Sequence, residues 1–425
     1  MRIPLLSERS VAQITAAQAH ARQVLGQRLP AHIEPSHVTV IGGAASGLAI
    51  ALILADAGVA VTYLEEDDSS LERAEFYLSR MVQTAGRTVP NLLDFSISGS
   101  AASRSDVILD LSLESLTAKT VRLQQVMAGA PDTALVVVNL AGQELEQIAS
   151  QLSCPSRVVG AQLCHAMGPS GVAELAAHPK SSKAALEQLW GFAGLLGRLP
   201  VNAGRARFLS ERFQMRVLEA ADTLLMDGST PWEIDEALEQ FGYQMGVYEA
   251  QDLIGMDVAY ALRQRMPAEP GRRKIPIADR AVEEGRLGKK ASVGWYRYPG
   301  GEGKVIDPLV EDLCREEAHF ARVQTRSFAD DDLRLRILLA LINEAAWALG
   351  EGVPVTDIDL ISLSALGFPQ DMGGVIWFAD DLGAGAIVDA LTGLCAEDPI
   401  AWRIAPALRR AASDGVPLSN TAISF

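Results

Sequence analysis

The hydrophobic pattern of residues 38–64 predicts a strand, a glycine turn, a helix and a second strand, in that order. Residues 38–41 are β-branched and mainly apolar, which favours a short buried strand. Glycines that favour a turn come next, residues 45–57 have the composition of a helix, and residues 59–64 are again strand-like. The glycines concerned are Gly42, Gly43, Gly47 and, at the end of the helix, Gly58. This layout is typical of a βαβ unit in a parallel sheet.

Glu65 directly follows the second predicted strand, 23 residues after Gly42. In a Rossmann βαβ unit the helix N-terminus faces the pyrophosphate of a dinucleotide, and an acid at this position accepts ribose hydroxyls. The apolar stretch also raises the alternative of a membrane span. Its glycines and Asp56 divide it into pieces too short to cross a bilayer, so the pattern favours a nucleotide-binding unit.

The pattern continues as an alternation of strands and helices to about residue 200. It predicts strands at 107–111, 134–139 and 158–163 and a helix at 114–127. This alternation predicts a doubly wound α/β sheet, the Rossmann architecture. From about residue 205 long amphipathic helices separated by Gly and Pro take over, so a mainly helical second half is expected.

That second half contains an internal repeat. Segments beginning at Arg212 and Arg336 share their hydrophobic pattern at an offset of 336 − 212 = 124 residues. The matched pairs are Gly228 with Gly352 and Asp235 with Asp359 at this offset, then Asp252 with Asp380 and Gly255 with Gly383 at 128. We therefore expect two related all-α domains, produced by an internal duplication, after the Rossmann domain.

These patterns predict five parts of the chain. They are an N-terminal helix and linker at 1–36, a Rossmann domain at 37–203, a first helical domain at 204–300, a linker at 301–324 and a second helical domain at 325–425. Residues 285–304 form a basic, Gly-rich connector at the end of the first helical domain.

Composition narrows the class and the compartment. The net charge of −16 argues against a general nucleic-acid binder, which needs clustered Lys and Arg. The four cysteines form no CxxC and no spacing that suits a metal, so we expect reduced thiols and no metal site. The N-terminus has charges where a signal peptide needs an apolar core. A cytoplasmic location, away from membranes, is the expectation.

Three motifs carry a resemblance to a known family. FGYQMGVYEAQDLIGMD (241–257), GRLGKKASVGWYRY (285–298) and ALGFPQDMGGVIWFAD (365–380) resemble segments of the L-3-hydroxyacyl-CoA dehydrogenases. From about His37 onward the chain is similar to the dehydrogenase portion of multifunctional fatty-acid oxidation proteins, without their hydratase domain. The resemblance implies NAD as cofactor and an acyl-CoA or related hydroxy compound as substrate. It also implies a monomer or a homodimer, because a second helical copy can occupy the face through which single-copy relatives dimerise.

The resemblance assigns a cofactor site residue by residue. The family loop G-A-G-T-M-G aligns with residues 42–47, so that Ala44 stands in place of the second glycine, which lets the backbone approach the pyrophosphate. The positions that align with cofactor-binding residues are Gly42, Ala44, Gly47, Glu65, Glu114, Lys119 and Asn139. A carboxylate at Glu65 favours NAD over NADP. The alternative for Glu114 and Lys119 is a solvated helix face.

The catalytic positions depart from the family. Its base, a His, aligns with Gln162, which cannot take up a proton near neutral pH. The carboxylate that orients the base is kept as Glu174, whereas the substrate-holding Ser and Asn align with Ala141 and Glu211. His165, three residues past Gln162, is the candidate substitute base, against the alternative of a packed histidine.

Two functions follow from this pattern. The first is an NAD-dependent oxidoreductase of the 3-hydroxyacyl-CoA dehydrogenase type that uses an altered catalytic site. The second is a catalytically silent relative that binds NAD or acyl-CoA and acts as a partner subunit or sensor. Turnover of a 3-hydroxyacyl-CoA panel with NAD distinguishes them.

Overall fold

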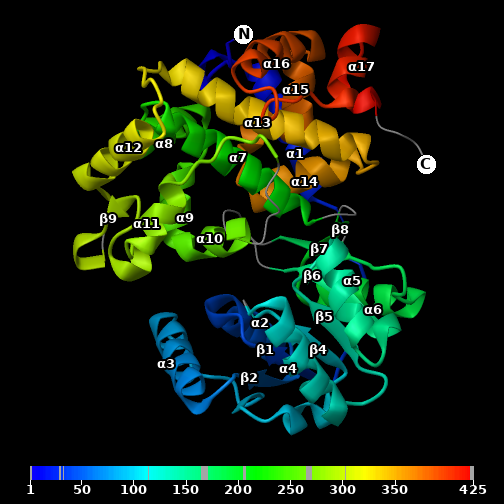
Figure 1. Cartoon of the computed structure of the whole chain (residues 1–425). Helices are drawn as coiled ribbons and strands as arrows, with labels where there is room; N and C mark the ends of the chain where they lie inside the picture. Colours follow the sequence, from blue (N-terminus) through cyan, green and yellow to red (C-terminus); the bar gives the residue numbers. More distant parts are fainter. Residues whose placement is uncertain are drawn as a thin grey trace. The chain divides into compact units, whose positions relative to one another are not determined.

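The computed structural model describes residues 2–27, 30–31, 33–112, 114–163, 171–203, 207–264, 270–301 and 303–421 (Figure 1). The chain divides into two compact units. A sheet unit lies within residues 27–208, and a helical unit combines residues up to 26 with those from 209 onward. We describe each unit by itself.

The sheet unit contains eight strands in the order β3-β2-β1-β4-β5-β6-β7-β8. Their bounds are β1 His37–Ile41, β2 Ala60–Leu64, β3 Leu93–Ser96, β4 Val107–Asp110, β5 Leu135–Val138, β6 Val158–Gln162, β7 Val172–Ala176 and β8 Leu199–Asn202. Neighbouring strands are parallel except for β6 and β7. The chain runs outward from β1 to β3 and then returns to β4 beside β1, which is the doubly wound topology of a Rossmann sheet.

Helices cover both faces of this sheet. Because successive strand residues point to opposite faces, Leu109 packs with one hydrophobic cluster and its neighbour Ile108 with the other. The helices are α2 Ala44–Asp56, α3 Asp68–Thr84, α4 Leu116–Gly129, α5 Gly142–Gln151 and α6 Lys183–Leu195. Side chains of α2, α3 and α6 join the first cluster and those of α4 and α5 the second. The predicted Rossmann domain, followed by helices, is confirmed.

The helical unit contains two successive groups of helices. The first group is α7 Leu209–Met226, α8 Pro231–Phe241, α9 Val247–Ile254, α10 Met256–Gln264 and α11 Ile277–Glu283. The second group is α13 Asp330–Gly350, α14 Val355–Ala365, α15 Val375–Leu382, α16 Ala384–Glu397 and α17 Pro406–Asp414. The two long helices, α7 and α13, pack against each other. A short hairpin of β9 Tyr296–Arg297 and β10 Val305–Ile306 follows the first group.

A buried aspartate fixes the same corner in each group. Asp235 of α8 accepts the backbone N–H of Tyr248 and Glu249 at the start of α9 (2.9 Å each). Asp359 of α14 accepts the N–H of Ile376 at the start of α15 (2.7 Å). Both carboxylates therefore satisfy N–H groups that a helix start leaves without partners.

The N-terminal helix α1, Val11–Leu25, packs against α14 and the short turn Gln370–Met372. His20 of α1 lies 2.9 Å from Asp359, and its ring stacks on Trp377. Arg9, with 2% of its side chain exposed, pairs with Asp381. Residues up to 26 thus belong to the helical unit. The sequence pattern did not predict that α1 packs there.

Part of the stretch that we expected to be a linker is helical. Residues 308–320 form α12, Pro308–Phe320. Asp307 caps its N-terminus and Pro308 occupies its first turn, where the missing N–H of proline costs nothing. Val310, Leu313 and Cys314 are buried.

A buried carboxyl group in α7 makes the stability of the helical unit depend on pH. Asp222 is buried and accepts the hydroxyl of Tyr248 (3.0 Å). Burial raises the pKa of Asp222 to about 6, against the opposing effects of Arg263 and Tyr248. The folded state therefore binds more protons than the unfolded state between about pH 4 and 6, so this group's contribution to stability falls as pH rises through that range.

Asp222→Asn removes this titration and keeps an oxygen for the Tyr248 hydroxyl. We expect the free energy of unfolding of the variant, minus that of the wild type, to rise by about 2–3 kcal/mol between about pH 4 and 7.5, since one pKa unit is worth about 1.4 kcal/mol. Urea titrations of both proteins across that range measure it. A difference that does not change with pH would contradict the assignment.

Candidate functional site at the carboxyl ends of the first strands

The candidate site lies where the chain reverses direction in the sheet unit. β1 pairs with β2 on one side and with β4 on the other, and all three strands are parallel. Their carboxyl ends therefore meet at one edge. In open α/β sheets ligands bind at such an edge, at the point where the strand order reverses.

The turn after β1 requires glycine at three positions. Gly42 and Gly43 have left-handed backbone angles, with φ of 56° and 87°. A Cβ on Gly43 would lie 2.7 Å from the Cβ of Leu111, and a Cβ on Gly47 would lie 1.9 Å from the Gly42 carbonyl oxygen. Because these residues lack a Cβ, α2 begins directly after the turn and presents its N-terminus to the edge, as anion-binding helices do.

Ala44 is strained in this turn. It begins α2 with a φ of 46°, an angle that residues with a Cβ rarely adopt, and its side chain is exposed. Such a conformation costs about 1–2 kcal/mol outside glycine. The backbone here thus keeps a glycine-like conformation although the residue is alanine.

An acid follows β2 at the same edge. Glu65 is half-buried and its N–H donates to the Ser96 carbonyl of β3 (3.0 Å). Tyr63, two residues before it, is fully buried beneath the edge. Burial, and then the negative charge of Glu65, raise the pKa of the Tyr63 hydroxyl.

Lys119 ties down the loop that connects β4 to α4. Its buried ammonium group donates to Asp110 Oδ1 (3.1 Å), the Ser112 carbonyl (2.6 Å) and Ser112 Oγ (3.0 Å). An ammonium group has three N–H donors, so all three are used. Lys119 is therefore no part of a solvated helix face. A Cβ on Gly42 would lie 3.2 Å from the Cβ of Ser112, so this loop forms the wall beside the glycine turn.

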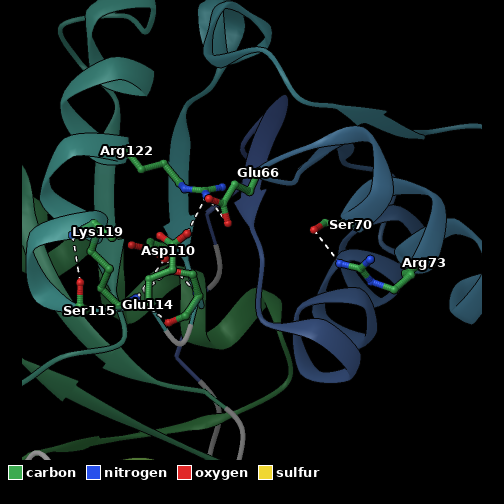
Figure 2. Close-up of polar contacts among 10 residues, drawn as sticks. Glu66, Ser70, Arg73, Asp110, Glu114, Ser115, Lys119 and Arg122 are labelled. Carbon is green, nitrogen blue, oxygen red and sulfur yellow. Dashed lines mark hydrogen bonds and ion pairs between the residues drawn. The ribbon is translucent and has the colours of Figure 1, made fainter.

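Glu114 lies in the same loop and is paired with Arg122 of α4. The distance from Arg122 Nη2 to Glu114 Oε1 is 2.6 Å, and the same nitrogen is 3.7 Å from Glu66 Oε2 (Figure 2). Glu114 Oε2 is buried and has no hydrogen-bond partner among the described residues. Asn139, after β5, donates its N–H to the Asp110 carbonyl (3.1 Å), and its Oδ1 is also buried without a partner in the described part of the chain.

These features fit a dinucleotide. The backbone at Gly43 and Gly47 leaves no room for a Cβ and lies at the N-terminus of α2, an arrangement that suits a pyrophosphate. The carboxylate of Glu65 and the unpaired oxygens of Glu114 and Asn139 are acceptors, which suit sugar hydroxyls and amides.

The predicted catalytic residues are divided between the later strands of the same sheet and the helical unit. Gln162 ends β6 and pairs in register with Glu174 of β7, which is completely buried. Ala141 precedes α5 as its N-cap and offers no side-chain cap. Glu211 lies in the first turn of α7, in the helical unit. His165 lies outside the described residues.

Four residues at the edge were missed by sequence reasoning: Asp110, Ser112, Arg122 and Glu66. Asp110 had a detectable signal, because a carboxylate at the end of a buried strand next to a helix that carries Lys119 suggests an ion pair. Arg122 had one as well, since it follows Lys119 by three residues and so shares its helix face.

The described residues contain no group of three or more His, Cys, Asp or Glu side chains arranged to hold a metal ion. None of the helices in the described ranges combines the length and the apolar composition needed to cross a membrane.

The fold and this edge define a nucleotide-binding α/β protein of the doubly wound class. Residues 37–206 match the family model described as 3-hydroxyacyl-CoA dehydrogenase, NAD binding domain. Residues 208–298 match the model described as 3-hydroxyacyl-CoA dehydrogenase, C-terminal domain. Together the two matches cover more than half of the chain. The chain belongs to the 3-hydroxyacyl-CoA dehydrogenase family, and the predicted family and cofactor, NAD, are confirmed.

Curated relatives are longer than this chain. The peroxisomal bifunctional enzyme of Danio rerio is 30% identical over 385 residues, which are 84% of this chain and 53% of that protein. The fatty acid oxidation complex subunit alpha of Idiomarina loihiensis is 27% identical over 330 residues, which are 76% of this chain and 46% of that protein. The chain spans about half the length of these relatives.

Solved structures share the fold. That of 3-hydroxybutyryl-CoA dehydrogenase from Escherichia coli K12 has a TM-score of 0.71 at 20% identity, covering 90% of this chain and 99% of that chain. The dehydrogenase part of multifunctional enzyme 1 from C. elegans has a TM-score of 0.60 at 21% identity, covering 95% and 97%. At these identities the likeness concerns the fold alone.

Replacing Ala44 by glycine tests the strained turn. Ala44→Gly relieves the left-handed strain, whereas Ala49→Gly, in the interior of the same helix, has only the usual glycine penalty of about 1 kcal/mol. We expect Ala44→Gly to be more stable than Ala49→Gly by about 2–3 kcal/mol in urea unfolding, the relieved strain plus the glycine penalty. It should also bind NAD more tightly in calorimetry, because the Cβ no longer limits the approach of the pyrophosphate. Equal destabilisation by both variants, with weaker NAD binding by Ala44→Gly, would refute this account.

Proposed function

We propose that this chain is an NAD-dependent oxidoreductase of the 3-hydroxyacyl-CoA dehydrogenase type that acts on a CH–OH group through an altered catalytic site. The observation that carries the proposal is the intact cofactor edge, where the glycine turn meets a wall held by Lys119 and Glu114 keeps one unpaired oxygen. An acyl-CoA or a related hydroxy compound is the proposed substrate.

Residues that follow four neighbouring strands, β2, β1, β4 and β5, would hold NAD. The turn at Gly42, Ala44 and Gly47 would receive the pyrophosphate, and Glu65 a ribose. Glu114 and Asn139 would accept hydrogen bonds through the oxygens that lack partners. When bound, NAD supplies the hydride acceptor.

Gln162 cannot serve as the general base. Its amide donates and accepts hydrogen bonds and can hold a substrate oxygen, but it does not take up a proton near neutral pH. We propose His165 as the substitute base, with Glu174 or Glu211 as its orienting carboxylate. The proposal for His165 rests on its place in the sequence, three residues past Gln162.

A second candidate function is a catalytically silent relative that binds NAD or acyl-CoA as a partner subunit or sensor. The replacement of the family's base by Gln162, together with Ala141 and Glu211 at the substrate-holding positions, favours it. Turnover decides between the two: NAD binding in calorimetry without reduced cofactor across a panel of 3-hydroxyacyl-CoAs supports the silent role. Turnover that His165→Ala abolishes supports the dehydrogenase.

Gln162→His tests whether the rest of the reaction centre is still competent. The new imidazole would stand opposite the buried Glu174 in the β6–β7 register. A general base contributes about 10²- to 10⁴-fold. In a His165→Ala background, which lacks the proposed base, we therefore expect Gln162→His to raise NAD reduction with 3-hydroxyacyl-CoA by at least about 10². Gln162→Asn in the same background, which adds no base, is the matched control. If neither the wild type nor the histidine variant reduces NAD, the dehydrogenase proposal fails.

We also infer that the two helical groups arose by duplication. Asp235 and Asp359 cap the following helix in the same way, 124 residues apart. A Cβ on Gly246 would lie 2.1 Å from the Asp235 carboxyl carbon, and one on Gly374 would lie 2.6 Å from that of Asp359. Glycine is thus needed at the same place in both groups, which supports a common origin.

This duplication predicts the oligomeric state. α13 of the second group packs along α7 of the first within one chain. If that contact replaces the one that single-copy relatives make with a partner, the chain is a monomer. We expect light scattering to give a mass near that of one chain, 45.4 kDa. Twice that mass, maintained on dilution, would support the homodimer instead.

The proposed setting is fatty acid metabolism in the cytoplasm. The names of the relatives, a fatty acid oxidation subunit and a peroxisomal enzyme, support the metabolism. The cysteines among the described residues, Cys154, Cys314 and Cys395, are free thiols, which suits a reducing compartment. Fractionation of cells that contain the full chain tests this location.

A further inference from the structure

Arg122 joins two acidic residues that follow different strands of the sheet. Glu66 comes shortly after β2 and Glu114 shortly after β4, and in the sheet these strands lie on either side of β1. The Arg122 guanidinium contacts both carboxylates, and Figure 2 shows it beside Glu66. The connection therefore runs from one side of the glycine turn to the other.

The two oxygens of Glu114 differ. Oε1 accepts a hydrogen bond from Arg122 Nη2 (2.6 Å), whereas Oε2 is buried and has no partner within the described residues. An ionised carboxylate with one oxygen bound to a cation has a fixed orientation, and its second oxygen remains an acceptor. Arg122 thereby determines where that acceptor lies. The side chain of Arg122 is 14% exposed, so solvent screens this pair only in part.

The other cation of α4 cannot replace it. All three donors of Lys119 are engaged with Asp110 and Ser112. Around the edge, four carboxylates (Glu65, Glu66, Asp110 and Glu114) face two cations, Lys119 and Arg122. NAD carries a negatively charged pyrophosphate, so a third unneutralised carboxylate would oppose its binding.

We propose that Arg122 is a positioning residue for NAD. It acts through Glu114, whose carboxylate it orients and neutralises so that Oε2 is ready to accept a ribose hydroxyl. Both of its contacts are made by the single nitrogen Nη2. The contact with Glu114 is short, and that with the exposed Glu66 is longer and steadies the guanidinium between the two strand ends. This proposal rests on NAD as the cofactor and not on turnover.

The test measures NAD binding to the full chain by calorimetry, with the variants Arg122→Met, Glu114→Ala and the double variant. We expect Arg122→Met to weaken NAD binding by about 10-fold, the usual worth of one charge-assisted hydrogen bond. Because Arg122 acts through Glu114, the double variant should bind within about 2-fold of Glu114→Ala. Arg122→Lys should recover most of the affinity, because one nitrogen makes both contacts.

Arg73→Met is the matched control. Among the described residues Arg73 donates to Ser69 and Ser70 of its own helix, so its removal should leave NAD binding unchanged. Thermal melting of each variant separates lost NAD binding from lost folding. If Arg122→Met unfolds, the NAD affinity of Arg122→Lys still tests the role of Arg122.

Losses that multiply in the double variant would overturn the role through Glu114, and an unchanged affinity of Arg122→Met would overturn any role in cofactor binding. In both cases the wild type would still bind NAD and the proposed function would stand. Absence of NAD binding by the wild type would overturn both.

Discussion

The buried ammonium group of Lys119 is the interaction on which the cofactor edge depends. It fixes Asp110 and both oxygens of Ser112, and so holds the loop against which the glycine turn packs. A buried lysine is stable only when its charge and all its donors are matched, as they are here. Glu114 and Arg122 then occupy defined places on the same loop and helix. The site is thus organised by a paired charge beneath the surface, and the acceptors for a cofactor are arranged around it.

The helical unit follows a comparable rule. In each helical group a buried aspartate satisfies the first N–H groups of the next helix, and a glycine leaves room for that carboxylate. In the second group Asp359 also contacts His20 of α1, so the N-terminal helix shares a group that shapes the corner. Desolvation raises the pKa of Asp359, and the hydrogen bond from His20 opposes that rise. These carboxylates stabilise the helix starts, and their burial has a desolvation penalty because it removes charge from water.

Much of the fold could be predicted from the sequence, because strand and helix periods are local properties. The predicted strand at 38–41 and helix at 45–57 correspond to β1 and α2, His37–Ile41 and Ala44–Asp56. The packing of α1 on α14 could not be predicted, since its polar contacts join residues more than 300 positions apart. Asp110 and Arg122 had a detectable signal in the sequence, but their individual contacts could not be predicted, because a residue's type does not reveal which oxygen it binds. Of the predicted reaction centre, Gln162 and Glu174 lie opposite each other on β6 and β7, and the predicted base His165 lies outside the described residues.

We infer that this chain binds NAD at an edge organised by Lys119 and Arg122. A crystal structure of the full chain soaked with NAD tests it most directly. The account predicts density for the pyrophosphate over the turn at Gly42, with Glu114 Oε2 within hydrogen-bond distance of a ribose hydroxyl and Glu114 Oε1 still bound to Arg122. NAD bound away from this turn, or Glu114 turned away from both the ribose and Arg122, would contradict it.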